Sequence, residues 1–265
     1  MTYLECEIPE NIGFVIPIGD IHLGDPSFRK ESSNKLNGYI NWIKENPNSR
    51  VFLMGDLFNC ATRISKTSPF DNSAEEGEGN NEFEQIVKLF YPIREQIVGA
   101  IDGNHEHRID DFANYNITLE FCKRLGIKYA HISCIVNFKI GKNNRKENTG
   151  GQWNEQYRIY FHHGTGGGNT SGGKINRAEK LMDIVEGCDA FVIGHNHGMG
   201  NMVRYRYYPS VKSKKIEKRK IHLVCIGGFL GYDDSYAERK MLSPVKLGAV
   251  RIRLDGRKHD LHVSD

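Results

Sequence analysis

Five short apolar runs, each followed at once by a cluster of polar side chains, constrain the fold of this chain more than any other feature of its sequence. Each run is four or five residues long, which is the length of a buried strand rather than of a helix. Polar residues at successive strand ends converge on one edge of a sheet, where open α/β folds place their active sites. The runs comprise residues 14–18, 51–54, 97–101, 157–161 and 190–193.

The polar clusters combine carboxylate, amide and imidazole groups. They are Asp20 with His22, Gly55-Asp56, Gly103 to Glu106, His162-His163-Gly164, and Gly194 to His197. This mixture of ligand types suits borderline divalent ions such as Mn, Fe, Zn, Ni or Co. Residues two apart, such as His195 and His197, lie on the same side of an extended segment and can reach the same ion. The pattern indicates a hydrolase that uses two metal ions.

The order of the clusters resembles that of the calcineurin-like metallophosphoesterase family, whose pattern is D-x-H, G-D, G-N-H-[DE], a histidine before glycine, and G-H-x-H. All five elements occur in that order between Asp20 and His197, about two-thirds of the chain. The resemblance implies a phosphoester hydrolase with an α/β fold: a four-layer αββα sandwich of two mixed β-sheets flanked by helices. It also implies one domain over residues 1–265, with a motif core at 14–200 and a β-rich part at 201–265 that completes the second sheet.

The same resemblance implies a set of metal ligands for two divalent ions, with Mn expected first and Fe, Zn, Ni or Co as alternatives. A carboxylate is needed to hold two cations close together, and Asp56 is the expected bridge. Asp20, His22 and His197 are expected at one ion, and Asn104, His163 and His195 at the other. Because neighbouring residues of a strand point to opposite faces, His162 is expected in the core or behind the ligands.

His105 is expected to act as the acid that protonates the leaving oxygen, or as a cation that orients the phosphate. Asp102 and Glu106 flank it and are candidate acceptors that orient its imidazole. The family often has an acidic residue three positions after the bridging aspartate, where this chain has Asn59. That position is not a ligand in the pattern, so the expected metal site is unaffected.

Four further side chains are candidate contacts to a substrate phosphate: His107, Arg108, Lys174 and Arg177. For each of them, simple surface exposure is an equally good explanation. The glycine-rich segment 168–175 also fits the spacing of a nucleotide-binding P-loop. A P-loop requires Ser or Thr after its lysine, and this chain has Ile175 there, so the sequence disfavours a nucleoside triphosphatase.

The substrate class is the least determined feature. The run from Arg204 to Tyr208 interleaves arginine and tyrosine, and the tract 212–220 is strongly basic. Such side chains pair with phosphates and stack on bases, which favours a phosphodiesterase that acts on DNA, RNA or nucleotides. An exposed strand and a solvated hairpin tip explain the same residues. The alternatives are a phosphomonoesterase for a phosphoprotein or metabolite, favoured if the insertion 62–81 closes the site, and a non-catalytic metal-binding scaffold.

The composition limits the possible partners and location of the chain but does not identify a function. A net charge of +3 permits nucleic acid without arguing for it, and it identifies no protein partner. Six cysteines without C-x-x-C spacing read as buried free thiols. The chain has no apolar run near the ~20 residues of a membrane span and no secretory signal pattern, so we expect a cytoplasmic protein without a membrane partner.

The remaining periodicity predicts helices and strands around the motifs. Apolar residues at helical spacing predict helices near 32–45, 82–95, 111–125 and 176–186. A hairpin is expected from 132–140 and 156–161, and further strands at 202–208, 221–226 and 247–254.

Overall fold

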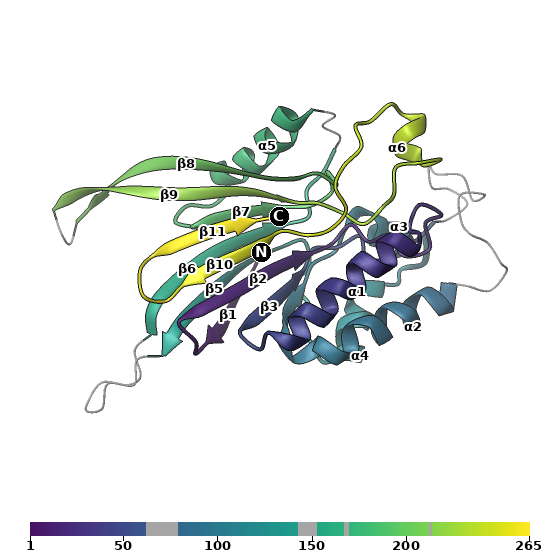
Figure 1. The fold of residues 1–265 in the computed structure, drawn as a ribbon, viewed down its shortest axis with the longest axis horizontal. Helices are drawn as coiled ribbons and strands as arrows, with labels where there is room; N and C mark the ends of the chain where they lie inside the picture. The colour runs from purple at the N-terminus through teal and green to yellow at the C-terminus, as the bar shows by residue number, and fades with distance from the viewer. Residues whose placement is uncertain (62–78, 143–152, 167–169, 212–213) are drawn as a thin grey trace.

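Two mixed β-sheets lie face to face in the structure, a computed structural model that describes residues 1–61, 79–142, 153–166, 170–211 and 214–265 (Figure 1). The five-stranded sheet has the order β11-β10-β2-β3-β4, and the six-stranded sheet has the order β1-β5-β6-β7-β9-β8. The five-stranded sheet comprises β2 (Ile12–Ile18), β3 (Ser49–Leu53), β4 (Ile97–Ala100), β10 (Arg251–Asp255) and β11 (Asp260–Ser264). The six-stranded sheet comprises β1 (Thr2–Ile8), β5 (Ser133–Lys142), β6 (Trp153–His162), β7 (Ala190–Ile193), β8 (Met199–Ser210) and β9 (Lys215–Ile226).

Helices cover the outer faces of both sheets. The outer face of the five-stranded sheet packs against α1 (Lys30–Glu45), α2 (Gly79–Phe90), the 3-10 helix η2 (Tyr91–Gln96) and α4 (Ile117–Leu125). The six-stranded sheet packs against α5 (Ser171–Lys180) and η3 (Leu181–Asp183). Helix α3 (Asn104–Ala113) follows β4, and the short α6 (Tyr236–Arg239) lies in the connection before β10. The predicted αββα sandwich is therefore confirmed.

The inner faces of the two sheets form one apolar core. It joins Val15 and Phe52 of the five-stranded sheet to Val136, Phe161 and Val192 of the six-stranded sheet, all fully buried. The rings of Phe52 and Phe161 stack across the interface, with centroids 4.1 Å apart and planes inclined by 16°. This aromatic pair fixes the separation of the sheets directly below the carboxyl ends of β3 and β6.

Helix boundaries differ from the prediction where proline or asparagine intervenes. The helix predicted at 82–95 changes to a 3-10 helix at Tyr91, because Pro92 lacks the N–H group that an α-helix needs. The helix predicted at 111–125 is two helices: α3 ends at Asn114, which has a left-handed backbone (φ 50°), and α4 begins after Asn116. The side-chain oxygen of Asn116 accepts the N–H of Leu119 at 2.6 Å and caps the new helix.

Strands were underpredicted at both ends of the chain. The prediction omitted β1 and β11. Strand β1 forms one edge of the six-stranded sheet, and β11 forms one edge of the five-stranded sheet. The basic tract 212–220, expected as a hairpin tip, lies from Lys215 onward within β9. The strands after residue 200 divide between the sheets, since β8 and β9 extend one and β10 and β11 the other. Most of the predicted insertion 62–81, and residues 143–152 between the two strands of the predicted hairpin, lie outside the described residues.

All six cysteines are buried and free, as the sequence predicts. No helix within the described ranges has both the length and the apolar character needed to cross a membrane.

Replacing Phe161 by alanine should destabilise the fold by about 3–5 kcal/mol, because it removes a fully buried ring and leaves a cavity between the sheets. Urea denaturation of the wild-type and Phe161→Ala proteins measures this loss. The control is Phe161→Leu, which fills most of the volume and should lose less. Equal stability of the wild-type and alanine proteins would contradict the role given to this pair.

Candidate metal centre

The polar clusters of the sequence meet where the carboxyl ends of strands from both sheets come together. Asp20, Asp56 and Asn104 follow β2, β3 and β4 of the five-stranded sheet, which run parallel to one another. His163 and His195 follow β6 and β7 of the six-stranded sheet, which are also parallel. The site therefore lies at the shared edge of the two sheets, as expected for ligands placed at strand ends.

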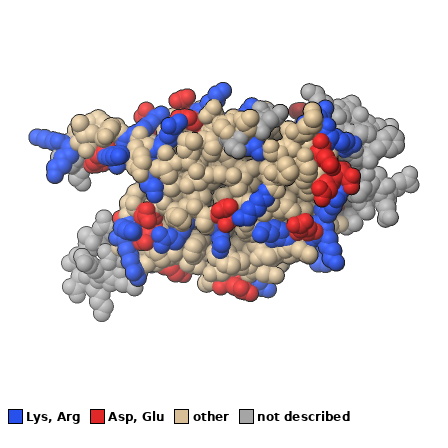
Figure 2. All heavy atoms as spheres, turned by 45° about the horizontal axis from the view of Figure 1, so that its top comes forward, with Lys and Arg blue, Asp and Glu red and all other residues tan. Residues whose placement is uncertain are grey.

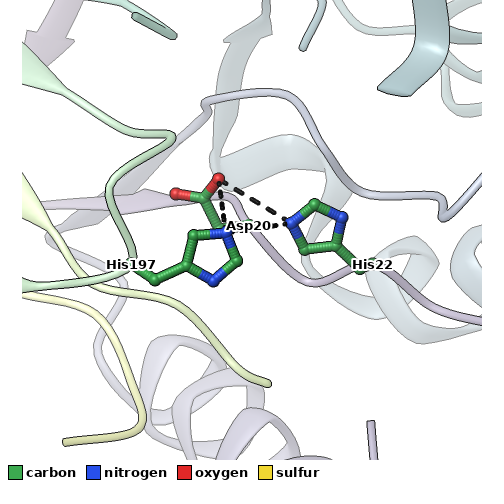
Figure 3. Close-up of side chains that lie close together, drawn as sticks. All are labelled: Asp20, His22 and His197. Atoms are coloured by element: carbon green, nitrogen blue, oxygen red, sulfur yellow. Dashed lines mark hydrogen bonds and ion pairs between the residues drawn. The ribbon is translucent and has the colours of Figure 1, made fainter. Parts of the chain in front are cut away.

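Asp20, His22 and His197 form the first group of side chains (Figure 3). Nε2 of His22 lies 3.3 Å from Nε2 of His197, and Oδ1 of Asp20 lies 4.0 Å and 3.8 Å from these two atoms. Asp20 and His22 are buried, whereas the His197 side chain is 30% exposed. Three donor atoms directed at one point, with one open side, suit a cation that also meets a substrate.

Asp56 lies between this group and a second one. Its Oδ2 is 3.7 Å from Nε2 of His22 and 3.2 Å from Nε2 of His163. His163 Nε2 is also 3.1 Å from Oδ1 of Asn104, and a donor atom of His195 lies within 4.8 Å of those of Asp56 and His163. The structure thus brings all seven predicted ligands together, with Asp56 in the central position.

A left-handed backbone occurs at five of these seven residues. The φ angles are 50° at Asp20, His22 and Asp56, 65° at His195 and 51° at His197. Few non-glycine residues adopt this conformation, and those that do cluster at functional sites. The sharp turns direct successive side chains from a strand end toward the same point.

Two glycines allow the loops after β3 and β4 to approach each other. A Cβ atom at Gly55 would overlap the backbone of Gly103, and one at Gly103 would overlap the carboxylate of Asp56. Gly55 also has φ 80°, which favours glycine. The glycines of the G-D and G-N-H motifs are therefore required by the close approach of Asp56 to the start of α3.

Glu106 binds backbone rather than the imidazole of His105, so the expectation for this residue was wrong. Its carboxylate accepts four buried backbone N–H groups, from Asp56 (2.9 Å), Leu57 (2.7 Å), Phe58 (3.2 Å) and Gly103 (3.0 Å). Burial and the Asp56 carboxylate raise the pKa of Glu106 to about 7, against the effect of these N–H groups. Glu106 thus fixes the Asp56 loop to the first turn of α3.

Asp102 does not orient His105 either. It accepts the hydroxyl proton of Tyr129, whose oxygen also accepts an N–H of Asn116 at 2.7 Å. This contact ties the residue before the G-N-H motif to the start of α4.

The orientation of His105 comes instead from a backbone carbonyl and an arginine. Nδ1 of His105 donates to the carbonyl of Asn59 at 2.7 Å, which leaves Nε2 as the other reactive position. Nη2 of Arg108 lies 2.9 Å from that Nε2. Burial and the Arg108 guanidinium lower the pKa of His105, which makes its protonated form a stronger acid.

Of the four candidate substrate contacts, three lie at the border of the site. Arg108 contacts His105, Lys174 lies against Gly198 beside His197, and Arg177 contacts the carbonyl of Thr165 in the loop after His163. His107 is two residues from His105 on α3, and residues at that spacing face different directions. Among the described residues, its side chain has no hydrogen bond or ion pair to the site.

Two positions that shape the site could not be identified from the sequence. One is the backbone carbonyl of Asn59, since any residue could supply it. The other is Gly228 after β9, where a Cβ would lie 3.1 Å from Nδ1 of His197 and 3.2 Å from Cβ of Asp20. Gly228 has no side chain that a pattern could reveal, and Asn59 acts through its backbone carbonyl and not through its amide. His162 is half-buried, and its Nδ1 accepts the N–H of Gly164 at 2.8 Å; its place in the core or behind the ligands stays a prediction.

The buried carboxylates and histidines of the site shift one another's pKa values. Burial raises the pKa of Asp20 to about 8, helped by the Asp56 carboxylate and opposed by His163. Although burial opposes both shifts, mutual attraction lowers the pKa of Asp56 and raises that of His163 to about 10. Two carboxylates this deeply buried need positive charge beside them, and divalent cations supply it.

Sequence comparison agrees with this geometry. The profile of the calcineurin-like phosphoesterase family matches residues 15–199, which include every side chain of both groups. This chain belongs to the calcineurin-like phosphoesterase family. The members of this family are phosphoesterases that use two metal ions.

No curated protein sequence matches this phosphoesterase. Among solved structures, it is similar to the Haemophilus influenzae NAD nucleotidase NadN, at 11% sequence identity and a TM-score of 0.41. The match covers 96% of this chain and 49% of the other, so the phosphoesterase spans about half the length of that structure.

Replacing Glu106 by alanine should leave four buried N–H groups without an acceptor and destabilise the phosphoesterase by at least about 2–3 kcal/mol. It should also loosen Asp56 and lower the amount of divalent metal that the protein binds. Glu106→Gln keeps one acceptor oxygen and should fall between wild type and alanine. Urea denaturation and metal analysis test both effects, and an alanine variant with wild-type stability would refute the assigned role.

Proposed function

We propose that this phosphoesterase hydrolyses phosphodiester bonds of nucleic acids or nucleotides at a centre of two metal ions, within a single domain of residues 1–265. The observation that carries the proposal is the central place of Asp56 between two groups of donors. Its Oδ2 is within 4 Å of histidine nitrogens from both groups.

The residues present fit two divalent cations. The donors are carboxylate, amide and imidazole, the set preferred by manganese and its neighbours. His195 adds a buried Nδ1 without a hydrogen-bond partner among the described residues. Asp20, His22 and His197 would hold one ion, Asn104, His163 and His195 the other, and Asp56 both. Bound there, the ions would neutralise the phosphoryl oxygens and acidify coordinated water.

The chain's own side chains position the phosphate and supply the proton. His105 is assigned as the acid for the leaving oxygen, with the Asn59 carbonyl fixing its ring. Arg108 lies beside it and would contact a non-bridging phosphate oxygen. Lys174 and Arg177 would attract the substrate from the opposite border. His107 stays a prediction, since it has no contact that supports it.

A diester is favoured over a monoester by the strand that leaves the site. Strand β8 begins two residues after His197 and carries Arg204, Tyr205, Arg206, Tyr207 and Tyr208. Alternating basic and aromatic side chains suit a polymer of phosphates and bases. Hydrolysis of a small phosphomonoester does not require such a strand. A non-catalytic scaffold does not require an oriented His105.

The deciding experiment compares manganese-dependent hydrolysis of bis-p-nitrophenyl phosphate and p-nitrophenyl phosphate. The proposal predicts a preference for the diester, and iron, zinc, nickel and cobalt are tested in parallel. A preference for the monoester would overturn it in favour of a phosphomonoesterase. Absence of turnover of either compound, with two metals bound, would instead support the scaffold.

Asp56→Asn should abolish turnover and reduce the bound manganese, because an amide cannot neutralise two adjacent cations. Metal analysis of the dialysed protein beside the diester assay measures both effects. Asp183→Asn is the matched control, since it makes the same change at an exposed position of η3 outside the ligand set. Normal activity of Asp56→Asn would remove the bridging role.

His105→Ala should leave the bound metal unchanged and slow cleavage of a dinucleotide by about 10²–10⁴-fold. The same variant should change hydrolysis of bis-p-nitrophenyl phosphate much less, because p-nitrophenolate leaves without needing a proton. Similar slowing of both substrates would show that His105 orients the phosphate and is not the acid.

A further inference from the structure

Strands β8 and β9 form a hairpin whose outer half projects beyond the rest of the six-stranded sheet (Figure 1). All twelve residues of β8 pair with β9, from Met199 with Ile226 to Ser210 with Lys215. Strand β7, in contrast, pairs only with the part of β9 from His222 to Cys225. We call the outer half, residues 204–211 and 214–220, the arm.

Aromatic side chains are exposed on both faces of the arm. Tyr205 and Tyr207 share a face with their partners Lys220 and Lys218, and the tyrosines are 57% and 75% exposed. Tyr208 lies on the opposite face and is 48% exposed. These large rings are not covered by any element that the structure describes, although helix α5 covers the inner half of the same hairpin.

The arm also concentrates the positive charge of the chain. Its described residues include seven Lys or Arg and one Glu, a net charge of +6, while the whole chain carries +3. Everything outside the arm therefore sums to −3. Figure 2 shows Lys and Arg gathered at the projecting end of the molecule. Arg204, Arg219 and Lys220 have carboxylate partners, whereas Arg206, Lys214, Lys215 and Lys218 have none among the described residues.

Rings and cations of the arm are arranged as stacked pairs. The Lys218 ammonium lies 4.3 Å from the centroid of Tyr205, and the Arg219 guanidinium lies 3.8 Å from that of Tyr208. Arg206 and Arg219 are direct cross-strand partners, although like charges at such positions repel. An anion bound between them would relieve this repulsion.

We infer that the arm binds single-stranded nucleic acid. Tyr205, Tyr207 and Tyr208 would stack on bases, and the unpaired basic side chains would contact phosphates, the combination used for sequence-tolerant binding of single strands. The charge argues against a second copy of this chain as the occupant, because two arms of +6 repel each other. The inference rests on the proposed function, since the bound strand is taken to be the substrate.

The distance between the arm and the metal centre makes the inference specific. At about 3.3 Å per residue, Tyr205 lies roughly 26 Å and Tyr208 roughly 36 Å along β8 from His197. Only a long strand can reach both places. Oligonucleotides long enough to span both places should therefore bind more tightly than shorter ones, and loss of the arm's contacts should remove this gain in affinity.

Fluorescence anisotropy with labelled oligo-dT of graded length tests this in the His105→Ala protein, which should keep its metal ions and cut the probe at least about 100-fold more slowly than wild type. Tyr205→Ala/Tyr207→Ala should weaken binding of long probes by about 5- to 150-fold for each base that no longer stacks. Arg206→Glu/Lys218→Glu should weaken it and lower the salt slope by about one for each phosphate that is no longer neutralised. Lys44→Glu/Lys88→Glu, on exposed positions of α1 and α2, makes the same charge change and should have little effect.

The outcomes separate the arm from the catalytic proposal. Arm variants in an otherwise wild-type chain should hydrolyse bis-p-nitrophenyl phosphate at the normal rate. Unchanged binding of long probes by these variants would overturn the inference and leave diester hydrolysis standing. Arm-dependent binding without any diester hydrolysis would uphold nucleic-acid binding and reject the proposed function. Arm-dependent binding to anionic lipid vesicles, or an arm-dependent dimer, without affinity for oligo-dT would also overturn the inference.

Discussion

The contact of the Glu106 carboxylate with four backbone N–H groups determines how the rest of the site is assembled. Three of these groups belong to the loop after β3 and one to the turn before α3. The contact holds Asp56 against the start of the helix that carries Asn104 and His105. The backbone N–H of His105 in turn donates to Oδ1 of Asp56 at 2.8 Å, so the expected bridge and the expected acid are positioned by one network.

The two-sheet architecture explains why the donors come from distant parts of the chain. Each sheet contributes parallel strands whose carboxyl ends meet at one edge. The Phe52–Phe161 stack and the shared core below it keep those edges together. A site with donors from both sheets forms only when the sheets are packed, which links the metal centre to the folded state of the whole sandwich.

The sequence predicted the donors well because their order and spacing are local properties. Asp20 with His22 and His195 with His197 needed only the strand before them and the i, i+2 rule. Most of the role of Glu106 could not be predicted, because three of its four partners are backbone groups about fifty residues earlier in the chain. The same holds for Asn59, which acts through its carbonyl. Edge strands β1 and β11 were missed although both alternate apolar with polar residues, at residues 4–8 and 260–264, so the period-2 signal of a half-buried strand was present in the sequence.

Left-handed backbones at five donor residues create a conflict between stability and chemistry. An L-residue in this conformation costs about 1–2 kcal/mol relative to glycine. Glycine at Asp20, His22, Asp56, His195 or His197 would relax the backbone and delete a donor at the same time. Engineering this chain for heat resistance alone would therefore select against its own active site, and a stability screen needs an activity assay beside it.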